Sequence, residues 1–300
     1  MNDHFKNIFK ENKKYLLIFL FCFLLMVLMT LREINFFEVI TNYIFKPEYR
    51  NSWWLTTDKP EIANSVSHGF FGFIQYIFKS SFFVFDSSLI AATSLFQIII
   101  PLISVFGGIT FFRNYNSIYK FSLNKNKKFR TTVYGKIMKN AFKLAISVFL
   151  AYLLIFFFLH SNINILTNAT SEAESREFLL DLLSDDFYIS NIKQYFLLEG
   201  FIRFFYIPLI YTMLVQAAVL IFTNFRDVFL VNIVYYYGLS TVGYALDLFI
   251  PSIAFYFNPS VIMASGSYAD INSIALLGIN SIPLLLSIVM IEWRCRYVEI

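Results

Sequence analysis

The sequence predicts an all-α membrane protein with six transmembrane helices. Hydrophobic residues make up 58% of the chain and charged residues only 15%, whereas soluble domains average about 25% charged. The apolar runs are continuous rather than alternating, which favours spanning helices over a β-barrel. Nine basic residues lie between Arg113 and Lys143 without a single acid, and a loop this basic is typical of the cytoplasmic side.

The basic stretch 113–143 decides the topology, because an apolar run long enough to cross a bilayer lies on each side of it, 89–112 and 144–159. With this loop in the cytoplasm, the side of every other loop follows from the number of spans between them. The cytoplasmic segments then hold 16 basic and 5 acidic residues, and the rest of the chain holds 8 basic and 15 acidic ones. We therefore expect both termini to be cytoplasmic, in a multi-pass protein of a bacterial plasma membrane.

The N-terminal residues 2–14 are polar and basic, with Phe5, Ile8 and Phe9 at helical spacing. Two interpretations stay open: a short helix in the cytoplasmic membrane interface, or the basic flank of the first span, 15–31. That span has no small-residue cleavage site, so we expect it to be retained rather than removed as a signal peptide.

Residues 32–87 are expected to be external, with Trp53 and Trp54 in a turn at the membrane surface. The Phe-rich part 69–85 contains Lys79, and a charge near the bilayer centre costs about 2.5–3.5 kcal/mol. A crossing there would also move one of the two basic segments outside. The sequence therefore predicts that 69–85 is an amphipathic external helix that does not cross.

The second and third spans are predicted at 89–112 and 142–159. Pro101 predicts a kink in the second span, and the pair Gly107-Gly108 predicts close helix packing. A second external segment, 161–200, is acidic and carries apolar residues at helical spacing, which predicts an acidic amphipathic helix.

The fourth and fifth spans, 201–223 and 228–250, are separated by the very short turn 224–227. They are therefore predicted to form an antiparallel hairpin with a cytoplasmic tip. Residues 251–272 are apolar but broken by Pro, Gly and Ser, which predicts two short helices that enter the outer leaflet and return. The sixth span is predicted at 271–291.

Motifs for catalysis and metal binding are missing from the sequence. There is no phosphate-binding loop, no nucleophile elbow and no cluster of the three histidines, so we expect no catalytic residue, metal or cofactor in this chain. The basic membrane face requires no nucleic acid. Gln97, Gln216 and Asn232 either bond between helices or line a polar path. Asp247 is either an interface acid or part of an ion pathway.

The sequence of the basic loop predicts a helix–turn–helix. Its first part, 114–123, presents Tyr115, Ile118, Tyr119 and Leu123 as one apolar helical face. A turn follows at 124–128, and a second helical stretch from 129 runs into the third span. Such a face lies either on lipid or on a soluble partner protein.

These features together resemble the type-2 permeases of the ATP-binding-cassette exporters. That family has an interface helix before the first of six spans and a coupling helix before the third, here 114–123. A small–basic pair follows the coupling helix, here Gly135-Lys136 after Arg130. A broken external helical pair precedes the last span, here 251–272 with Asn258-Pro259. The family often has a Glu near the start of the coupling segment, where Arg113 and Asn114 stand in this chain.

The resemblance implies a permease subunit that pairs with a second, identical or related, permease subunit. A separate cytoplasmic ATPase would bind ATP and Mg and drive an amphipathic or lipophilic cargo, such as a peptide or a lipid, across the bilayer. The residues expected to dock this ATPase are Tyr115, Ile118, Tyr119, Lys120, Leu123 and Arg226. Two other functions stay open: a non-transporting membrane sensor or immunity partner, and an ion-coupled carrier or intramembrane enzyme.

Overall fold

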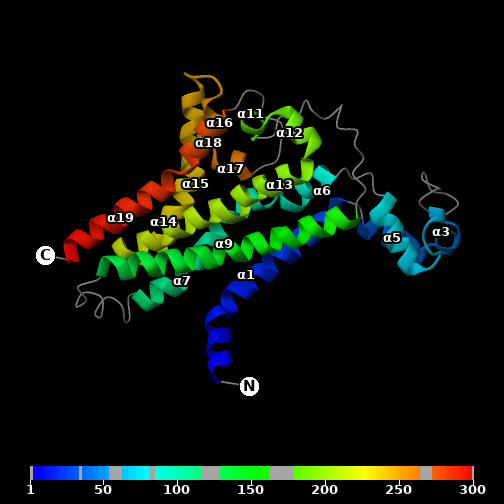
Figure 1. Cartoon of the computed structure of the whole chain (residues 1–300), viewed down its shortest axis with the longest axis horizontal. Coiled ribbons are helices and arrows are strands. Elements are labelled where there is room, and N and C mark those ends of the chain that lie inside the picture. Colours follow the sequence, from blue (N-terminus) through cyan, green and yellow to red (C-terminus); the bar gives the residue numbers. More distant parts are fainter. Residues whose placement is uncertain are drawn as a thin grey trace. The chain divides into compact units, whose positions relative to one another are not determined.

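A computed structural model describes residues 3–33, 36–53, 63–80, 85–115, 129–162, 179–263 and 272–298 (Figure 1). All regular elements in these ranges are helices. Six stretches among them are long and apolar enough to cross a membrane, which confirms the predicted fold class and span number. These stretches are Asn12–Arg32, Leu89–Asn114, Phe129–Leu159, Ile192–Ile221, Phe225–Asp247 and Ser273–Arg296.

The first helix, α1 (Asp3–Glu33), runs without a break for 31 residues. It contains neither Pro nor Gly, so nothing in its sequence ends the helix before the membrane. The N-terminal interface helix predicted at 2–14 is therefore not a separate element. The structure agrees with the other interpretation: the basic residues form the first turns of the same helix as the first span.

Helix α9 (Phe129–Asn162) has 34 residues, which confirms the prediction that the helical stretch from 129 runs into the third span. The fourth span begins at Ile192 instead of 201, since α13 (Ile192–Phe201), the π-helical turn η2 (Ile202–Tyr206) and α14 (Ile207–Ile221) follow each other directly. The external segment predicted at 161–200 is correspondingly shorter.

The chain divides into two compact units. The first comprises Met1–Leu20, Leu95–Leu150 and Ala173–Ile300. Its centre is α14, in which 13 of 15 residues are buried. A helix that is apolar on all sides is stable in this position because other helices surround it. Here α14 packs along α7 (Phe96–Asn114) and α19 (Ile282–Val298) and also contacts α15 (Phe225–Asp247).

Two glycines allow α7 to approach α14 closely. A Cβ atom on Gly107 would lie 2.9 Å from Thr212 Cγ2 and 2.6 Å from Leu144 Cδ1. A Cβ atom on Gly108 would lie 2.4 Å from Val215 Cγ1. These distances are too short for any side chain, so the structure confirms that the glycine pair serves close helix packing.

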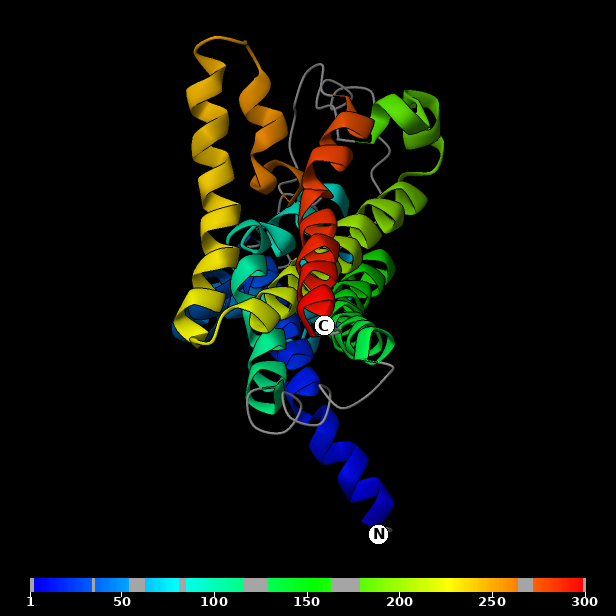
Figure 2. The same ribbon diagram turned by 90° about the vertical axis from the view of Figure 1, so that its left-hand side faces the viewer.

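The chain after α15 turns back toward the bundle. Residues 222–224 alone connect α14 to α15, in agreement with the short turn predicted there. After α15, the short helices α16 (Ile253–Phe257) and α17 (Pro259–Met263) run back beside it, in orange next to the yellow α15 in Figure 2. Ser252 starts this return with a left-handed φ of 67°. The last stretch, α18 (Ser273–Asn280) and α19, follows.

Gly243 on α15 is the point of closest approach to the returning helices. A Cβ atom there would lie 2.8 Å from Phe257 Cβ and 3.3 Å from Ala254 Cα. Asp247 accepts a hydrogen bond from the Ala254 amide at 3.4 Å. Asp247 thus joins the end of α15 to α16.

The described end of the acidic segment contains two short helices, α11 (Leu180–Leu183) and α12 (Asp185–Ser190), so a predicted helix in this segment ends at Leu183. Ser184 separates them with a φ of 66°, and its hydroxyl accepts a hydrogen bond from the Phe187 amide at 3.4 Å. Residues 163–178 lie outside the described ranges.

The second unit comprises Phe21–Ser94 and Ala151–Glu172. Its described residues contain the ends of α1 and α9 together with four shorter helices. These are α2 (Phe36–Phe45), α3 (Pro47–Ser52), α5 (Phe70–Ser80) and α6 (Phe85–Thr93). At 1.5 Å per residue, the 11 residues of α5 cover about 17 Å, roughly half of a ~30 Å bilayer core. Helix α5 is therefore shorter than a span, and the external position of 69–85 stays a prediction.

An aromatic cluster joins α2 and α5 to Trp53, the residue that follows α3. The ring of Phe73 stacks on Tyr43 at 4.2 Å and meets Trp53 edge-on at 5.2 Å. Trp53 is fully buried in this cluster, so it does not form part of an exposed surface turn; Trp54 lies outside the described residues. Large aromatic rings supply this unit with a core although its helices are short.

Candidate functional site

A polar seam joins α7 and α15 around Pro101. In a regular helix the carbonyl of Gln97 would accept a bond from the amide of residue 101, but proline has no N–H. The hydroxyl of Tyr236, a buried residue of α15, donates to this carbonyl instead. One turn earlier on α15, Asn232 Nδ2 donates to the carbonyl of Pro101 at 2.7 Å. Tyr237 donates to the carbonyl of Ile98 at 2.9 Å.

The helical period explains this arrangement. Asn232 and Tyr236 are four residues apart and share one face of α15, while Gln97 and Pro101 have the same spacing on α7. Two of the three residues predicted to line a path, Gln97 and Asn232, therefore meet at this seam. Gln97 contributes its main-chain carbonyl, and the residue is half-buried. Lining of a transport path by either residue stays a prediction.

Buried polar side chains also gather on α14. The Tyr211 ring lies edge-on to Tyr235 at 6.1 Å and to Tyr236 at 5.5 Å. Thr212 and Gln216 follow on the same helix, and both are fully buried. Within the described part of the chain, the Thr212 hydroxyl and both amide atoms of Gln216 have no hydrogen-bond partner. Buried polar atoms of this kind are candidates to bind water or a polar group of a ligand.

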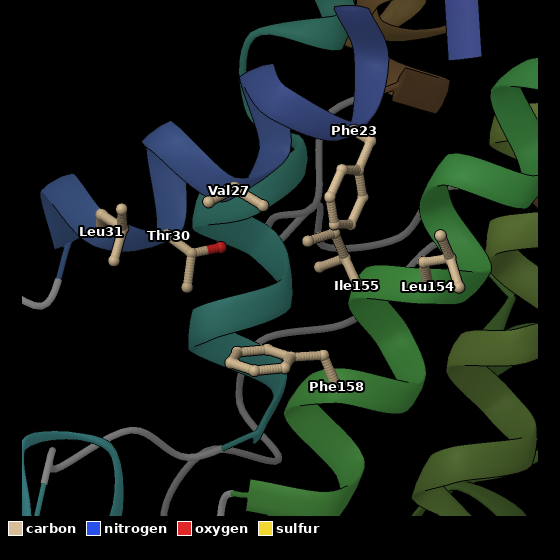
Figure 3. A pocket seen from close by; sticks show the side chains of 7 residues that line it. All are labelled: Phe23, Val27, Thr30, Leu31, Leu154, Ile155 and Phe158. Carbon is tan, nitrogen blue, oxygen red and sulfur yellow. The ribbon is translucent and has the colours of Figure 1, made fainter. Parts of the chain in front are cut away.

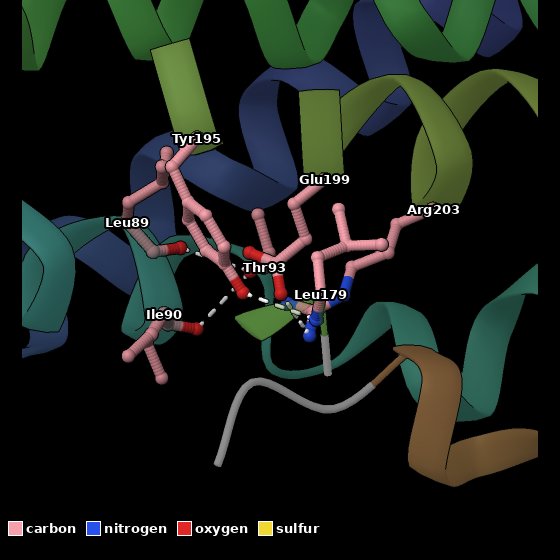
Figure 4. A network of polar contacts seen from close by, with 7 residues as sticks. All are labelled: Leu89, Ile90, Thr93, Leu179, Tyr195, Glu199 and Arg203. Carbon is pink, nitrogen blue, oxygen red and sulfur yellow. Dashed lines mark hydrogen bonds and ion pairs between the residues drawn. The ribbon is translucent and has the colours of Figure 1, made fainter. Parts of the chain in front are cut away.

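A buried ion pair interrupts the fourth span, and sequence reasoning missed it. Arg203 Nη2 lies 2.6 Å from Glu199 Oε1, and the two side chains are only 3% and 2% exposed. Figure 4 shows both side chains pointing toward each other from successive turns. The sequence signal for this pair is an acid and a base four residues apart in an apolar stretch, but the predicted boundary at 200/201 places Glu199 in the external segment and Arg203 in the span.

The backbone changes at the same point. The π-helical turn η2 begins at Ile202, directly between the two charged residues. Single π-helical turns inside α-helices are frequent at functional sites. Charged residues within membrane spans are rare and usually mark a pathway or a switch. The pair and the π-turn together make this part of the fourth span a second candidate site.

The second unit contains an apolar groove of about 430 Å³ between α1 and α9 (Figure 3). Its lining residues are Phe23, Val27, Thr30, Leu31, Leu154, Ile155 and Phe158. The only polar side chain among them, Thr30, already donates to the Met26 carbonyl at 2.9 Å. Such a lining suits hydrocarbon and offers no group that could orient a polar substrate.

Among the residues predicted to dock an ATPase, one is buried, one is exposed, and the others lie outside the described residues. Tyr115 is 3% exposed and stacks on Phe111, one turn earlier, with ring centroids 6.1 Å apart, so it is not on the surface. Arg226 is exposed in the first turn of α15 and pairs with Asp227 at 3.4 Å. Ile118, Tyr119, Lys120 and Leu123 lie outside the described residues. Docking through these residues stays a prediction.

An ion pair connects the start of α9 to the end of α19. Arg130 Nη2 lies 2.6 Å from Glu292 Oε1, and the Tyr134 hydroxyl donates to the same oxygen at 2.8 Å. The Arg130 side chain is 60% exposed, so solvent screens the pair and it contributes little stability. It does position the first turn of α9, where the basic stretch enters the third span.

In the described residues, no three His, Cys, Asp or Glu side chains are grouped to hold a metal ion, and both cysteines are free and buried. No protein-family model, curated protein or solved structure matches the chain.

Proposed function

We propose that the protein is the transmembrane permease subunit of an ATP-binding-cassette exporter. The observation that carries the proposal is the broken helical pair α16–α17, which folds back along α15 directly before the last span. Type-2 permeases, which the sequence resembles, have a broken external helical pair at this place in the chain order. The break falls at Asn258-Pro259, where the sequence interrupts the helix.

Three further features support the proposal. The structure has six helices that are long enough to span, and only residues 222–224 connect the fourth to the fifth. The polar seam around Pro101 and the buried side chains of α14 give an apolar bundle a limited polar interior. A limited polar interior suits an amphipathic or lipophilic cargo, such as a peptide or lipid, better than an ion. Two permease subunits would form the path, and a separate ATPase would bind ATP and Mg.

Purification in mild detergent tests this function. We expect an ATPase with a phosphate-binding loop to co-purify with the wild-type protein and to hydrolyse ATP. The double variant Ile118→Ala/Tyr119→Ala should release this ATPase, because a buried aromatic anchor contributes about 2 kcal/mol or more, roughly thirtyfold in affinity.

The matched control reverses charge instead of removing apolar contacts. If the loop lies on lipid, Lys125→Glu/Lys127→Glu is the damaging change and the Ile118/Tyr119 variant keeps the ATPase. The proposal as a whole fails if no ATPase co-purifies with the wild-type protein in any mild detergent and ATP does not drive export of a cargo.

The buried pair Glu199–Arg203 favours a second candidate, an ion-coupled carrier, because such charges mark ion and proton pathways in membranes. This candidate expects Glu199→Gln to abolish uptake or export driven by an ion gradient. In a permease driven by ATP, the same variant would leave ATP hydrolysis by the partner in place. Transport assays in vesicles with an imposed gradient, with and without ATP, distinguish the two.

A further inference from the structure

Two spanning stretches lose their regular α-helical form close to a proline. In the fourth span, the π-helical turn η2 directly precedes α14, which has Pro208 in its first turn. In the sixth span, α18 and α19 are separated at Ser281, and Pro283 lies in the first turn of α19. Proline has no N–H to donate to the carbonyl four residues earlier, so each helix lacks an internal hydrogen bond at this point. Long helices usually bend at irregularities of this kind.

A hydrogen bond joins the two breaks. The hydroxyl oxygens of Tyr206, the last residue of η2, and Ser281 lie 2.6 Å apart. The Ser281 hydroxyl has a single hydrogen, which it donates to the Leu277 carbonyl at 2.6 Å. Tyr206 is therefore the donor in the bond between the two spans. The two breaks thus lie side by side, at the same level of the bundle.

The helices on one side of the breaks, α11, α12, α13 and α18, are tied to one another, and we call them the cap. The Asp181 carboxylate accepts hydrogen bonds from the amide of Ser273, at 2.8 Å, and from its hydroxyl, which links α11 to the start of α18. The Tyr195 hydroxyl on α13 accepts from the Leu179 amide at 3.3 Å, and the Tyr188 ring on α12 meets Tyr195 edge-on at 4.8 Å. The cap is therefore one connected body.

The helices on the other side of the breaks, α14 and α19, pack along each other and form a second body. Asn280, the last residue of α18, lies at the break between the two bodies and is only 1% exposed. Its Oδ1 has no hydrogen-bond partner among the described residues. The arrangement seen here thus leaves a buried acceptor unsatisfied, which lowers its stability relative to an arrangement that pairs this atom.

We propose that the cap swings as one body about the two paired breaks, and that the hydrogen bond from Tyr206 to Ser281 holds it in the arrangement seen here. Each break allows rotation because it lacks a helical hydrogen bond, and two breaks at one level define a single hinge. Since α18 also contacts α16 and α17, a swing of the cap displaces the broken pair beside α15. The hinge requires no particular energy source, so it does not rest on the proposed function.

Distances between spin labels, measured by double electron–electron resonance, test the hinge in the full chain in lipid nanodiscs. Both native cysteines are replaced by serine, and labels are attached to cysteines placed at two exposed positions, Leu198 on α13 and Leu285 on α19. We expect two distances in this parent chain. Tyr206→Phe should raise the ratio of the second arrangement to the first about three- to tenfold, which corresponds to roughly 0.6–1.4 kcal/mol.

Matched changes separate this hydrogen bond from general effects. Ser281→Ala should raise the ratio as Tyr206→Phe does, and the two changes together should add nothing, because they remove the same bond. Ser287→Ala also removes a serine hydroxyl, but one that donates to the Leu284 carbonyl of its own helix, and it should leave the ratio unchanged. An unchanged ratio in both Tyr206→Phe and Ser281→Ala, or an equal rise in Ser287→Ala, would overturn the proposal.

A swing is distinguished from unfolding by two further measurements. Labels at Leu182 on α11 and Ile274 on α18, both exposed, lie within the cap and should give one unchanged distance in every variant. If that distance changes as well, the cap unfolds instead of swinging and the proposal fails. Pro283→Ala restores an N–H at the break in the sixth span and should lower the ratio, which a folding defect does not do. A ratio that Pro283→Ala raises or leaves unchanged, or a single Leu198–Leu285 distance in every chain, would refute the hinge.

Discussion

Removal of the Tyr236 hydroxyl should destabilise the bundle through a carbonyl on another helix. In the structure this hydroxyl donates to the carbonyl of Gln97, which has no helical donor because residue 101 is proline. Tyr236→Phe keeps the ring, its burial and its contact with Tyr211. The variant therefore isolates a single hydrogen bond in the interior of the first unit.

The expected cost follows from what the carbonyl loses. A buried polar group left unsatisfied costs about 1–3 kcal/mol in soluble proteins. Hydrogen bonds between membrane helices average about 0.6 kcal/mol and reach about 1.7 kcal/mol. The hydrogen bond to the Gln97 carbonyl should lie at the upper end of this range of energies, because the carbonyl has no helical donor to replace it. We expect Tyr236→Phe to lower the free energy of unfolding by about 1–2 kcal/mol.

A double-mutant cycle with Pro101→Ala tests the cause. Alanine restores the N–H that the Gln97 carbonyl lacks, so Tyr236→Phe should cost about 1 kcal/mol less in this background. The measurement is equilibrium unfolding in mixed micelles with increasing denaturing detergent. Tyr237→Phe is the matched control, since it removes an equivalent hydroxyl from a residue that is 40% exposed and whose acceptor, Ile98, keeps its helical donor on residue 102.

Equal costs of Tyr236→Phe in the wild-type and Pro101→Ala backgrounds would refute this reasoning, because no coupling would then exist between the proline and the hydroxyl. A cost of Tyr237→Phe as large as that of Tyr236→Phe would refute it as well.

Three further predictions concern packing, capping and buried charge. Gly108→Ala should lower the free energy of unfolding by about 1–3 kcal/mol, because its Cβ would lie 2.4 Å from a side-chain atom of α14. Gly135→Ala, which has open space around it, should be neutral or stabilising in the same unfolding assay. Asp181→Ala should lower the free energy of unfolding by about 0.5–2 kcal/mol, because Asp181 accepts hydrogen bonds from both the amide and the hydroxyl of Ser273. It should also expose the start of α18 to proteolysis, and an unchanged rate of digestion would contradict this. Arg203→Met should destabilise the fold by about 3–5 kcal/mol and lower the folded yield, because it removes the cation that pairs with the buried Glu199 carboxylate; replacing Glu199 with Gln as well should restore most of the yield.

The class of the protein and the number of spans follow from the amino-acid sequence. Transfer into a bilayer depends on the apolar length of each segment, which is a local property, so six runs of sufficient length predict six helices. Local chemistry also predicts the short turn after α14, the break before Pro259 and the close packing at Gly107 and Gly108. Charge predicts that the Phe-rich residues 69–85 do not form a span, and α5 within them is shorter than a span.

The pairing of polar groups, in contrast, is a property of the packed bundle. Asn232 and Tyr236 bond to carbonyls 131 and 139 residues away, and no local pattern announces such a pairing. Tyr115 has the spacing of a surface face, yet it is buried on Phe111, because α7 extends further than its apolar run. Whether a polar side chain lies inside a bundle depends on the neighbouring helices, and their positions follow from packing across the whole chain.

The N-terminal region shows both kinds of information together. Its sequence predicts a basic flank followed by a membrane helix, since charge and hydrophobicity change at residue 15. That Lys14 and Lys143, on a helix more than a hundred residues later, lie over the same ring, that of Tyr15, is a consequence of how α1 and α9 pack. The amino-acid types determine the level at which a residue lies in the membrane, and helix packing determines its neighbours at that level.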